Sequence, residues 1–170
     1  MKLLRRLFTP APDPRDALRC VWAAAVREAR DPAWYREGGV ADTLEGRYDM
    51  VSAVLALVQI RMERSASLAP KTGPLTELFV EEMDGQLRQS GVGDLMVGKQ
   101  VGKLMASLGG RTGAYRTALA ADEAALEQAV GRNITLADEG RAGAAAALLA
   151  RLAERLAATD DTALLAGAFA

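Results

Sequence analysis

The side chains best placed to do chemistry in this 170-residue chain belong to a glycine–lysine motif. Gly93, Gly98 and Lys99 match most of a phosphate-binding P-loop, a glycine-rich loop that follows a strand, opens a helix and surrounds nucleotide phosphates. The next position is Gln100, however, where magnesium binding requires a Ser or Thr hydroxyl. The residues between the two glycines favour a helix, and no strand pattern precedes them. The motif therefore predicts helix boundaries rather than a nucleotide site.

The other reactive side chains form no catalytic arrangement. The chain has no histidine, which removes the commonest general base and the commonest metal ligand together. Carboxylates occur in adjacent pairs, at Glu81-Glu82 and Asp160-Asp161, and adjacent residues of a helix do not face one another. The single cysteine, Cys20, has apolar neighbours that predict a buried, inert thiol. We therefore expect a protein that is not an enzyme and that holds no metal or cofactor.

The composition indicates a globular, helical protein. Half of the residues are hydrophobic and 25% are charged, which excludes a disordered chain, and aromatic residues are few beside alanine and leucine. The net charge of −1 predicts no DNA partner, because general nucleic-acid binders are more basic. No apolar run is long enough to cross a bilayer, and the N-terminus lacks the cleavage pattern of a signal peptide. A cytoplasmic protein is expected.

The first 13 residues predict a tail that is separate from a helical domain at 14–170. Lys2, Arg5 and Arg6 alternate with apolar residues within 1–8, a pattern typical of a short helix on an anionic membrane surface. Peripheral contact with the inner face of a membrane is therefore one interpretation. The other is a frayed or packed tail, because eight residues bury little area and short isolated helices are marginal.

Helical periodicity predicts an all-α, single-domain bundle of about seven helices with no sheet. The central core helix is expected at 42–65, where both sides are apolar and Asp42 with Glu45 resembles a capping box. Trp34 and Tyr35 are either core aromatics with satisfied polar atoms or a surface that recognises an apolar peptide. The remaining helices are expected at 14–30, within 75–119, and at 122–130, 138–158 and 162–169.

The chain is organised around 75–119, which reads as two helices joined by a tight turn. Gly91 can take the left-handed conformation that ends the first helix, Gly93 lies in the link, and Asp94 is a suitable N-cap for the second helix. A link this short makes the two helices neighbours. Gly98 and Gly102 share one face of the second helix and favour close approach by another helix, either inside the bundle or from a partner.

Many ordered positions between 18 and 119 also form a recognisable pattern. They are Trp34-Tyr35, Gly39-Val40, Asp42-Thr43, Gly46-Arg47-Tyr48, Met83-Asp84, Leu87-Arg88, Gly91-Val92-Gly93-Asp94-Leu95, Val97-Gly98-Lys99, Met105, Gly110-Arg111, Tyr115 and Ala118-Leu119. This pattern resembles the signature of the ubiquinol–cytochrome c chaperone family, whose members are assembly factors for the cytochrome bc1 complex. The C-terminal helices, at 122–169, add little to the resemblance.

The resemblance implies a non-catalytic chaperone for assembly of the cytochrome bc1 complex, with newly made cytochrome b as its client. Mitochondrial members are associated with the ribosome and a small partner protein. Gln100 and Gly102 stand where further basic side chains are expected, so a ribosome contact is left open. The absence of an organelle presequence fits a bacterial setting. The alternatives are a helical adaptor without chaperone action and a small-molecule-binding bundle, for a quinone or for haem held by Met or Cys.

Charged and polar positions of the pattern supply the candidate partner-binding residues, because packing does not require them. They are Asp84, Arg88, Lys99, Lys103, Arg111 and Tyr115. Our hypothesis is that several of them are exposed and contact cytochrome b or another bc1 assembly protein. The alternative is an internal salt-bridge network that locks the two helices together, with Arg88 or Arg111 paired to Asp84.

Overall fold

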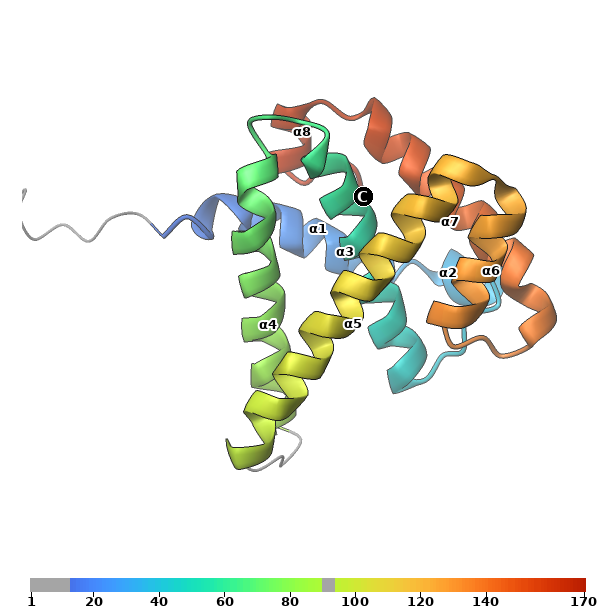
Figure 1. The fold of residues 1–170 in the computed structure, drawn as a ribbon, viewed down its shortest axis with the longest axis horizontal. Coiled ribbons are helices and arrows are strands. Elements are labelled where there is room, and N and C mark those ends of the chain that lie inside the picture. The colour runs from blue at the N-terminus through green and yellow to red at the C-terminus, as the bar shows by residue number, and fades with distance from the viewer. Residues whose placement is uncertain (1–12, 90–93) are drawn as a thin grey trace, which may run out of the picture.

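Helices dominate the computed structural model of the chain, which describes residues 13–89 and 94–170 (Figure 1). The side chains of 86–101 are outside this description, as is the proposed membrane-contacting segment at 1–8. Within the described ranges, the extended backbone pairing is one isolated antiparallel bridge between Val40 and Leu136. The predicted all-α fold without a sheet is therefore confirmed for this part of the chain.

The α-helices follow one another with short connections. They are α1 (Arg19–Ala29), α2 (Pro32–Arg36), α3 (Leu44–Glu63), α4 (Thr72–Gln89), α5 (Asp94–Ala121), α6 (Glu123–Asn133), α7 (Ala142–Ala158) and α8 (Asp161–Leu165). Short 3-10 turns lead into α1, α4 and α7 at Asp16–Leu18, Ala69–Lys71 and Glu139–Arg141. None of the described helices combines the length and the apolar composition that a membrane span needs.

Helix α3 is the central element, as its sequence predicts. Every residue of 52–60 is buried, and α1, α4, α5 and α7 all pack against this helix. Its N-cap is Thr43, whose hydroxyl accepts from the Gly46 N–H at 3.2 Å. Asp42, the predicted capping residue, instead forms an ion pair with Arg47 at 2.7 Å.

Several helix boundaries differ from the sequence-based expectation: α7 begins at Ala142 rather than at 138, α8 ends at Leu165 rather than at 169, and α1 and α6 differ as well. The first α-helix begins at Arg19 rather than at 14, because the Asp13 carboxylate accepts from the Arg15 N–H and guanidinium and a 3-10 turn follows. Helix α6 continues through Gly131 to Asn133, where a break was expected. A single glycine lowers helix propensity by only about 1 kcal/mol, so the surrounding packing decides.

Helices α4 and α5 are neighbours, as predicted; they meet near their connected ends and diverge from there (Figure 1). Gly91 and Gly93 lie outside the described residues, and Asp94 begins α5, although its side chain is not described. The stretch from Asp94 through Lys99 is helical and follows α4, so the described residues of the glycine–lysine motif show neither the strand nor the loop of a nucleotide site. No described atom lies within 4 Å of a Cβ built at Gly102, so the close internal neighbour predicted there is absent from the described residues.

The C-terminal helices belong to the same bundle. Asp122 and Asp160 cap α6 and α8 by accepting from Ala125 and Ala163, each at 2.8 Å. Arg61 of α3 donates to the Thr159 carbonyl at 2.7 Å, which attaches the end of α7 to the core. The chain therefore continues the core packing beyond the region that carries the sequence resemblance.

The aromatic residues of α2 have structural roles, whereas the cysteine differs from expectation. Trp34 is buried, its indole N–H donates to the Glu28 carbonyl at 2.9 Å, and the Tyr35 hydroxyl donates to the Ala29 carbonyl at 3.0 Å. Cys20 is exposed, which contradicts the predicted buried thiol. The neighbouring Val21 occupies the inward position of α1, so Cys20 falls on its outer face.

Candidate functional site

The predicted partner-binding residues lie in different environments. Lys103 is exposed on α5. Asp84 on α4 is half-buried and interacts with other groups. The side chains of Arg88 and Lys99 are outside the described part of the structure. The structure therefore leaves Asp84 and Lys103 as described candidates for a partner contact.

Arg111 and Tyr115 are largely buried in the bundle. Tyr115 is fully buried, and this burial raises the pKa of its phenol above the ordinary value. Only 12% of the Arg111 side chain is exposed, and its guanidinium forms an ion pair with Asp49 of α3. The internal ion pair offered by the sequence thus exists at Arg111, but its partner is Asp49 and not Asp84.

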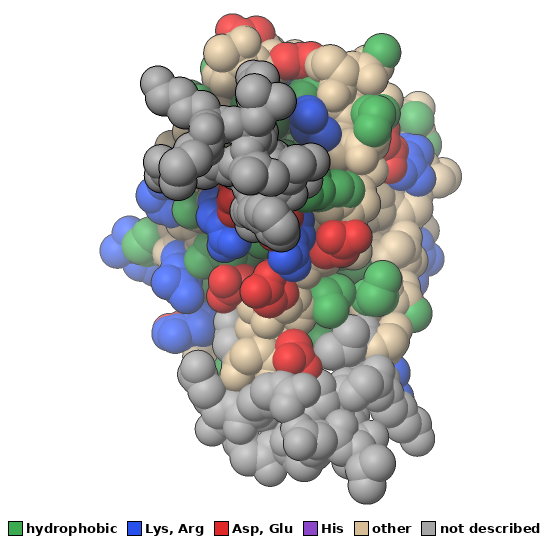
Figure 2. All heavy atoms as spheres, turned by 90° about the vertical axis from the view of Figure 1, so that its left-hand side faces the viewer, with side chains coloured by type: hydrophobic (Ala, Val, Ile, Leu, Met, Phe, Trp, Pro, Cys, Tyr) green, Lys and Arg blue, Asp and Glu red, His purple; other side chains and the backbone are tan. Residues whose placement is uncertain are grey.

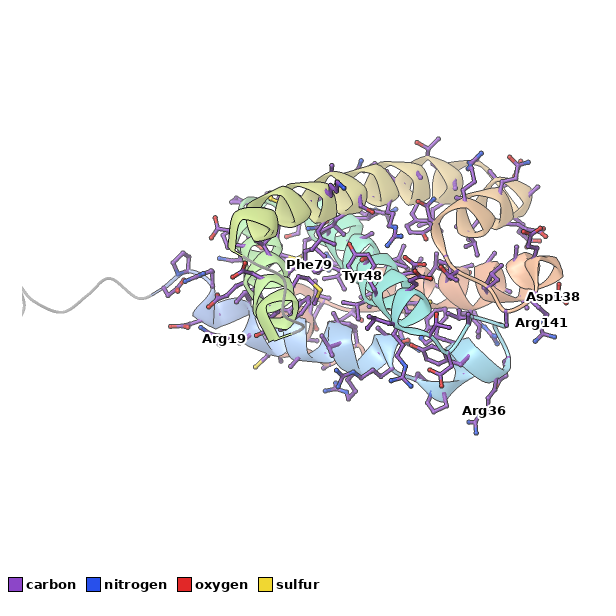
Figure 3. All side chains as sticks on the ribbon, turned by 90° about the horizontal axis from the view of Figure 1, so that it is seen from below. Arg19, Arg36, Tyr48, Phe79, Asp138 and Arg141 are labelled. Carbon is purple, nitrogen blue, oxygen red and sulfur yellow. The ribbon has the colours of Figure 1, made fainter. Side chains whose placement is uncertain are left out.

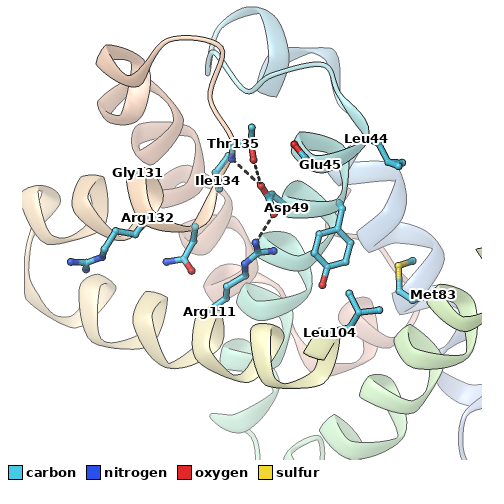
Figure 4. A pocket seen from close by; sticks show the side chains of 12 residues that line it. Leu44, Glu45, Asp49, Met83, Leu104, Arg111, Gly131, Arg132, Ile134 and Thr135 are labelled. Carbon is cyan, nitrogen blue, oxygen red and sulfur yellow. Dashed lines mark hydrogen bonds and ion pairs between the residues drawn. The ribbon is translucent and has the colours of Figure 1, made fainter. Parts of the chain in front are cut away.

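Asp49 joins three parts of the fold through one buried carboxylate. One carboxylate oxygen accepts from Arg111 of α5. The other accepts from the backbone N–H and the hydroxyl of Thr135, at 2.9 and 2.7 Å, in the segment after α6 (Figure 4). A buried charge is tolerated when it is paired and hydrogen-bonded in this way. Sequence analysis did not single out Asp49, although an acid among buried apolar residues of α3 was the available signal.

This ion pair forms the polar floor of a pocket of about 640 Å³ (Figure 4). Apolar and aromatic side chains form much of the wall, contributed by Leu44, Tyr48, Met83, Leu104 and Ile134. Arg111 also lies 5.4 Å from the centre of the Tyr48 ring, a cation–π contact that fixes both side chains. Helices α3, α4, α5 and α6 therefore each contribute to one concave site.

A second pocket, of about 670 Å³, continues the same surface towards α1 and α2. It shares Leu44, Tyr48 and Met83 with the first pocket, and Trp22 and Tyr35 extend its aromatic wall. We call the two pockets together the α3 groove. Both volumes lie within the range of about 300–1,000 Å³ that is usual for ligand sites.

Leu44 stands between the two pockets and is 84% exposed. The Tyr48 ring beside it packs against Phe79 inside the bundle, with ring centres 6.4 Å apart (Figure 3). Arg36, near the second pocket, points away from the body of the molecule (Figure 3). The α3 groove is thus an accessible apolar surface with charged residues at its edge.

Away from the groove, charged side chains of both signs are mixed. Figure 2 shows acidic and basic side chains next to one another on one face, and Arg15 pairs with Glu81 of α4 at 3.0 Å. Arg111 does not add to an exposed basic surface beside Lys103, because its side chain turns inward to Asp49. Among the described residues, no group of three or more side chains could hold a metal ion.

The adjacent carboxylates at 160 and 161 serve the fold. Asp160 caps α8, whereas Asp161 forms an ion pair with Arg61 at 2.9 Å. Asp161 also accepts from the hydroxyls of Ser65 and Ser67, at 2.5 and 2.8 Å. These hydroxyls and Arg61 lower the pKa of Asp161 to about 2. These two carboxylates therefore cap α8 and attach it to α3 and the following connection, and they do not form an acid–base pair.

Comparison with known proteins identifies the family. The family model described as Ubiquinol-cytochrome C chaperone matches residues 36–170. The chain belongs to this family. The match includes α6, α7 and α8, so the family pattern extends well beyond the residues that carried the resemblance. A comparison with curated proteins gives no match.

A solved structure agrees with this family membership. The crystal structure of the Cbp3 homolog from Brucella abortus is 32% identical in sequence and has a TM-score of 0.78. The similarity covers 98% of this chain and 92% of that chain. Membership of the ubiquinol–cytochrome c chaperone family supports a role in assembly of the cytochrome bc1 complex and contact with a component of that complex.

Proposed function

We propose that this protein is a non-catalytic chaperone that holds an apolar segment of newly made cytochrome b in the α3 groove during bc1 assembly. The observation that carries the proposal is Leu44, which is 84% exposed between two pockets with apolar and aromatic walls. Large apolar side chains at the edge of a concave surface are typical of sites that bind another polypeptide. An apolar membrane segment before insertion has the matching chemistry.

The charged residues around the groove divide between two roles in this proposal. Arg111 forms part of the pocket floor through its ion pair with Asp49, whereas Tyr115 is buried in the bundle and lines neither pocket. Lys103, which is exposed and precedes Leu104 of the pocket wall, contacts the client or another assembly protein at the rim. Asp84, Arg88 and Lys99 remain proposed contacts on the same pair of helices. Residues 1–8 are proposed to contact the inner face of the membrane.

The proposal is tested by making the exposed groove residue polar. Leu44→Gln leaves the core untouched, because the side chain is already in solvent, but it removes apolar contact area from the groove. We expect an unchanged melting temperature, reduced crosslinking to cytochrome b and a lower content of bc1 complex in cells that carry the variant.

Met105→Gln is the matched control. Met105 is also a large exposed apolar side chain, at 48%, and it lines neither pocket. This variant should retain crosslinking and bc1 content. Equal effects of the two substitutions, or no effect of either, would show that the α3 groove is not the client site.

A further inference from the structure

Buried polar atoms without a hydrogen-bond partner gather where α3 faces α5. On α3 they are the hydroxyl oxygens of Tyr48 and Ser52, one helical turn apart. On α5 they are Nη1 of Arg111 and the hydroxyl of Tyr115, again one turn apart. Native proteins leave few buried polar groups unpaired, so a cluster of them between two packed helices requires an explanation.

Two of these atoms belong to residues of the first pocket. Tyr48 and Arg111 both line it, whereas Ser52 and Tyr115 do not. Asp49 holds Arg111 through the other terminal nitrogen, Nη2, and leaves Nη1 unused. A guanidinium N–H can only donate, and a tyrosine hydroxyl can donate as well. The pocket therefore offers two donors to a ligand that brings an oxygen acceptor.

The local charge selects a neutral acceptor. Arg111 is already balanced by Asp49, and the rim adds one residue of each sign, Glu45 and Arg132. A ligand carboxylate would bring an uncompensated negative charge into a partly buried site, which is unfavourable. A carbonyl oxygen satisfies the same donors without this penalty.

In an apolar helical segment, carbonyl oxygens that are free to accept a hydrogen bond occur only at the C-terminal end. Within a helix the backbone carbonyls bond to N–H groups one turn later, except for those of the last turn, which have no partner in the helix. The same turn carries the negative end of the helix dipole, which favours a nearby guanidinium. The apolar wall of Leu44, Met83 and Leu104 suits the side chains around that turn.

We infer that the pocket between α3, α5 and α6 receives the C-terminal turn of an apolar client helix. The client's last carbonyl oxygens accept hydrogen bonds from Arg111 Nη1 and the Tyr48 hydroxyl. This inference rests on the proposed function, and it adds which end of the client is recognised and by which atoms.

Entry of the client requires a small movement of the pocket wall. The Tyr48 hydroxyl and Arg111 Nη1 are buried, and Leu104 and Met83 line the same pocket as Tyr48 and Arg111. The flexible side chains of Leu104 and Met83 turn aside when the helix end enters. In the bound state, the Tyr48 hydroxyl and Arg111 Nη1 donate hydrogen bonds to the client's carbonyl oxygens. Because these buried groups are then paired, binding is favoured.

Tyr48→Phe tests the inferred contact with a minimal change. The variant keeps the ring and removes a hydroxyl that has no hydrogen-bond partner among the described residues, so its melting temperature should be unchanged or higher. The probe is a fluorescein-labelled helix of leucine and alanine with lysines at its N-terminal end and an amidated C-terminus. Loss of one hydrogen bond should weaken its binding roughly 2- to 12-fold.

Tyr115→Phe is the matched control, because it also removes a buried, unpaired hydroxyl but lies outside the pocket. Its probe affinity should equal that of the unmodified protein. A probe with a diazirine in its last turn should label the pocket, whereas a diazirine in its first turn should not. Unchanged binding by Tyr48→Phe, equal loss in both variants, or labelling by the first turn overturns the inference.

These outcomes are separable from failure of the proposed function. If Leu44→Gln loses crosslinking to cytochrome b while Tyr48→Phe binds the probe normally, the groove is the client site and the inference about the helix end is wrong. If Leu44→Gln has no effect, the proposed function fails at this groove whatever the probe shows.

Discussion

Asp49 and Arg111 show how one residue pair determines the shape of a site. Their ion pair joins α3 to α5, and Thr135 adds the segment after α6 to the same carboxylate. The sequence places Arg111 in a family-like pattern but does not say which side of α5 it occupies in the bundle. The partner is 62 positions away, so only the packed structure brings the two charges together.

Arg111→Ala should destabilise the protein by about 3–5 kcal/mol, because it leaves the buried Asp49 carboxylate without its cation. Urea denaturation at neutral pH measures this change. Lys103→Ala, which removes an exposed cation from the same helix, should change the free energy of unfolding by no more than about 0.5 kcal/mol. An equally small effect of both substitutions would mean that the ion pair does not stabilise the fold.

Exposure of single residues is the property that the sequence predicted least well. Cys20 was expected inside and is exposed, whereas Tyr115 was a candidate contact and is buried. Both errors come from helix rotation. A shift of one residue turns a side chain by about 100°, and the start of α1 or the tilt of α5 depends on tertiary contacts.

At the scale of elements, α8 is held to the rest of the fold by polar contacts in addition to its buried core residue Leu164. Asp161 forms an ion pair with Arg61 of α3. It also accepts hydrogen bonds from the hydroxyls of Ser65 and Ser67, which lie in the connection between α3 and α4. The same arginine donates to the Thr159 carbonyl at the end of α7. One carboxylate therefore links the C-terminal helices to the start of the α4–α5 pair.

Asp161→Asn should lower the melting temperature at pH 7, because the charged form of Asp161 is the form that its neighbours stabilise. The pKa of this carboxyl is lowered from 3.8 to about 2 in the folded protein, chiefly by hydrogen bonds from Ser65 and Ser67 and by Arg61. Its contribution is fully present above pH 3.8 and disappears as the pH falls through about 2. Melting curves from pH 7 to pH 2 should show the two proteins converging.

Asp160→Asn provides the control for this prediction. Asparagine caps a helix as well as aspartate does, so this neighbouring substitution should leave the melting temperature at pH 7 nearly unchanged. A constant difference between Asp161→Asn and the unmodified protein at every pH would show that the lost contact is not electrostatic.

The elements themselves were largely predictable because each carries its own signal. Apolar spacing predicted α3, α4, α5 and α7, and side-chain caps at Asp122 and Asp160 are present where helices were expected to begin. The start of α1 and the end of α6 were not predictable locally. At both places a tertiary or polar contact outweighs a capping residue or a glycine.

At the scale of the whole molecule, the α3 groove could not be predicted from sequence. Its shared wall joins Leu44 and Tyr48 of α3 to Met83 of α4, and its floor uses Thr135 from the segment after α6. Each of these residues reads as ordinary packing in its own helix. The groove forms only when these helices are packed against one another in the folded protein. The family pattern is concentrated on α4 and α5 and does not mark the groove.

The rim of the groove provides the last prediction. Lys103 is exposed beside Leu104 of the pocket wall, and Lys99 lies one helical turn earlier on α5. We propose that Lys99 shares the exposed surface of Lys103; an exposed lysine contributes little to folding, so Lys99→Ala with Lys103→Ala should leave the melting temperature unchanged. If these cations contact cytochrome b or another assembly protein, the bc1 content of cells should fall.

Arg64→Ala with Arg151→Ala, which removes two exposed arginines that line neither pocket of the α3 groove, controls for the loss of positive charge alone. A lower melting temperature together with a parallel loss of bc1 complex would instead assign the lysines to an internal network that locks α4 and α5. Normal values for both measurements would remove this basic pair from the docking surface. The groove would then bind its client by apolar contact and by the polar floor alone, since neither depends on the charge of the rim.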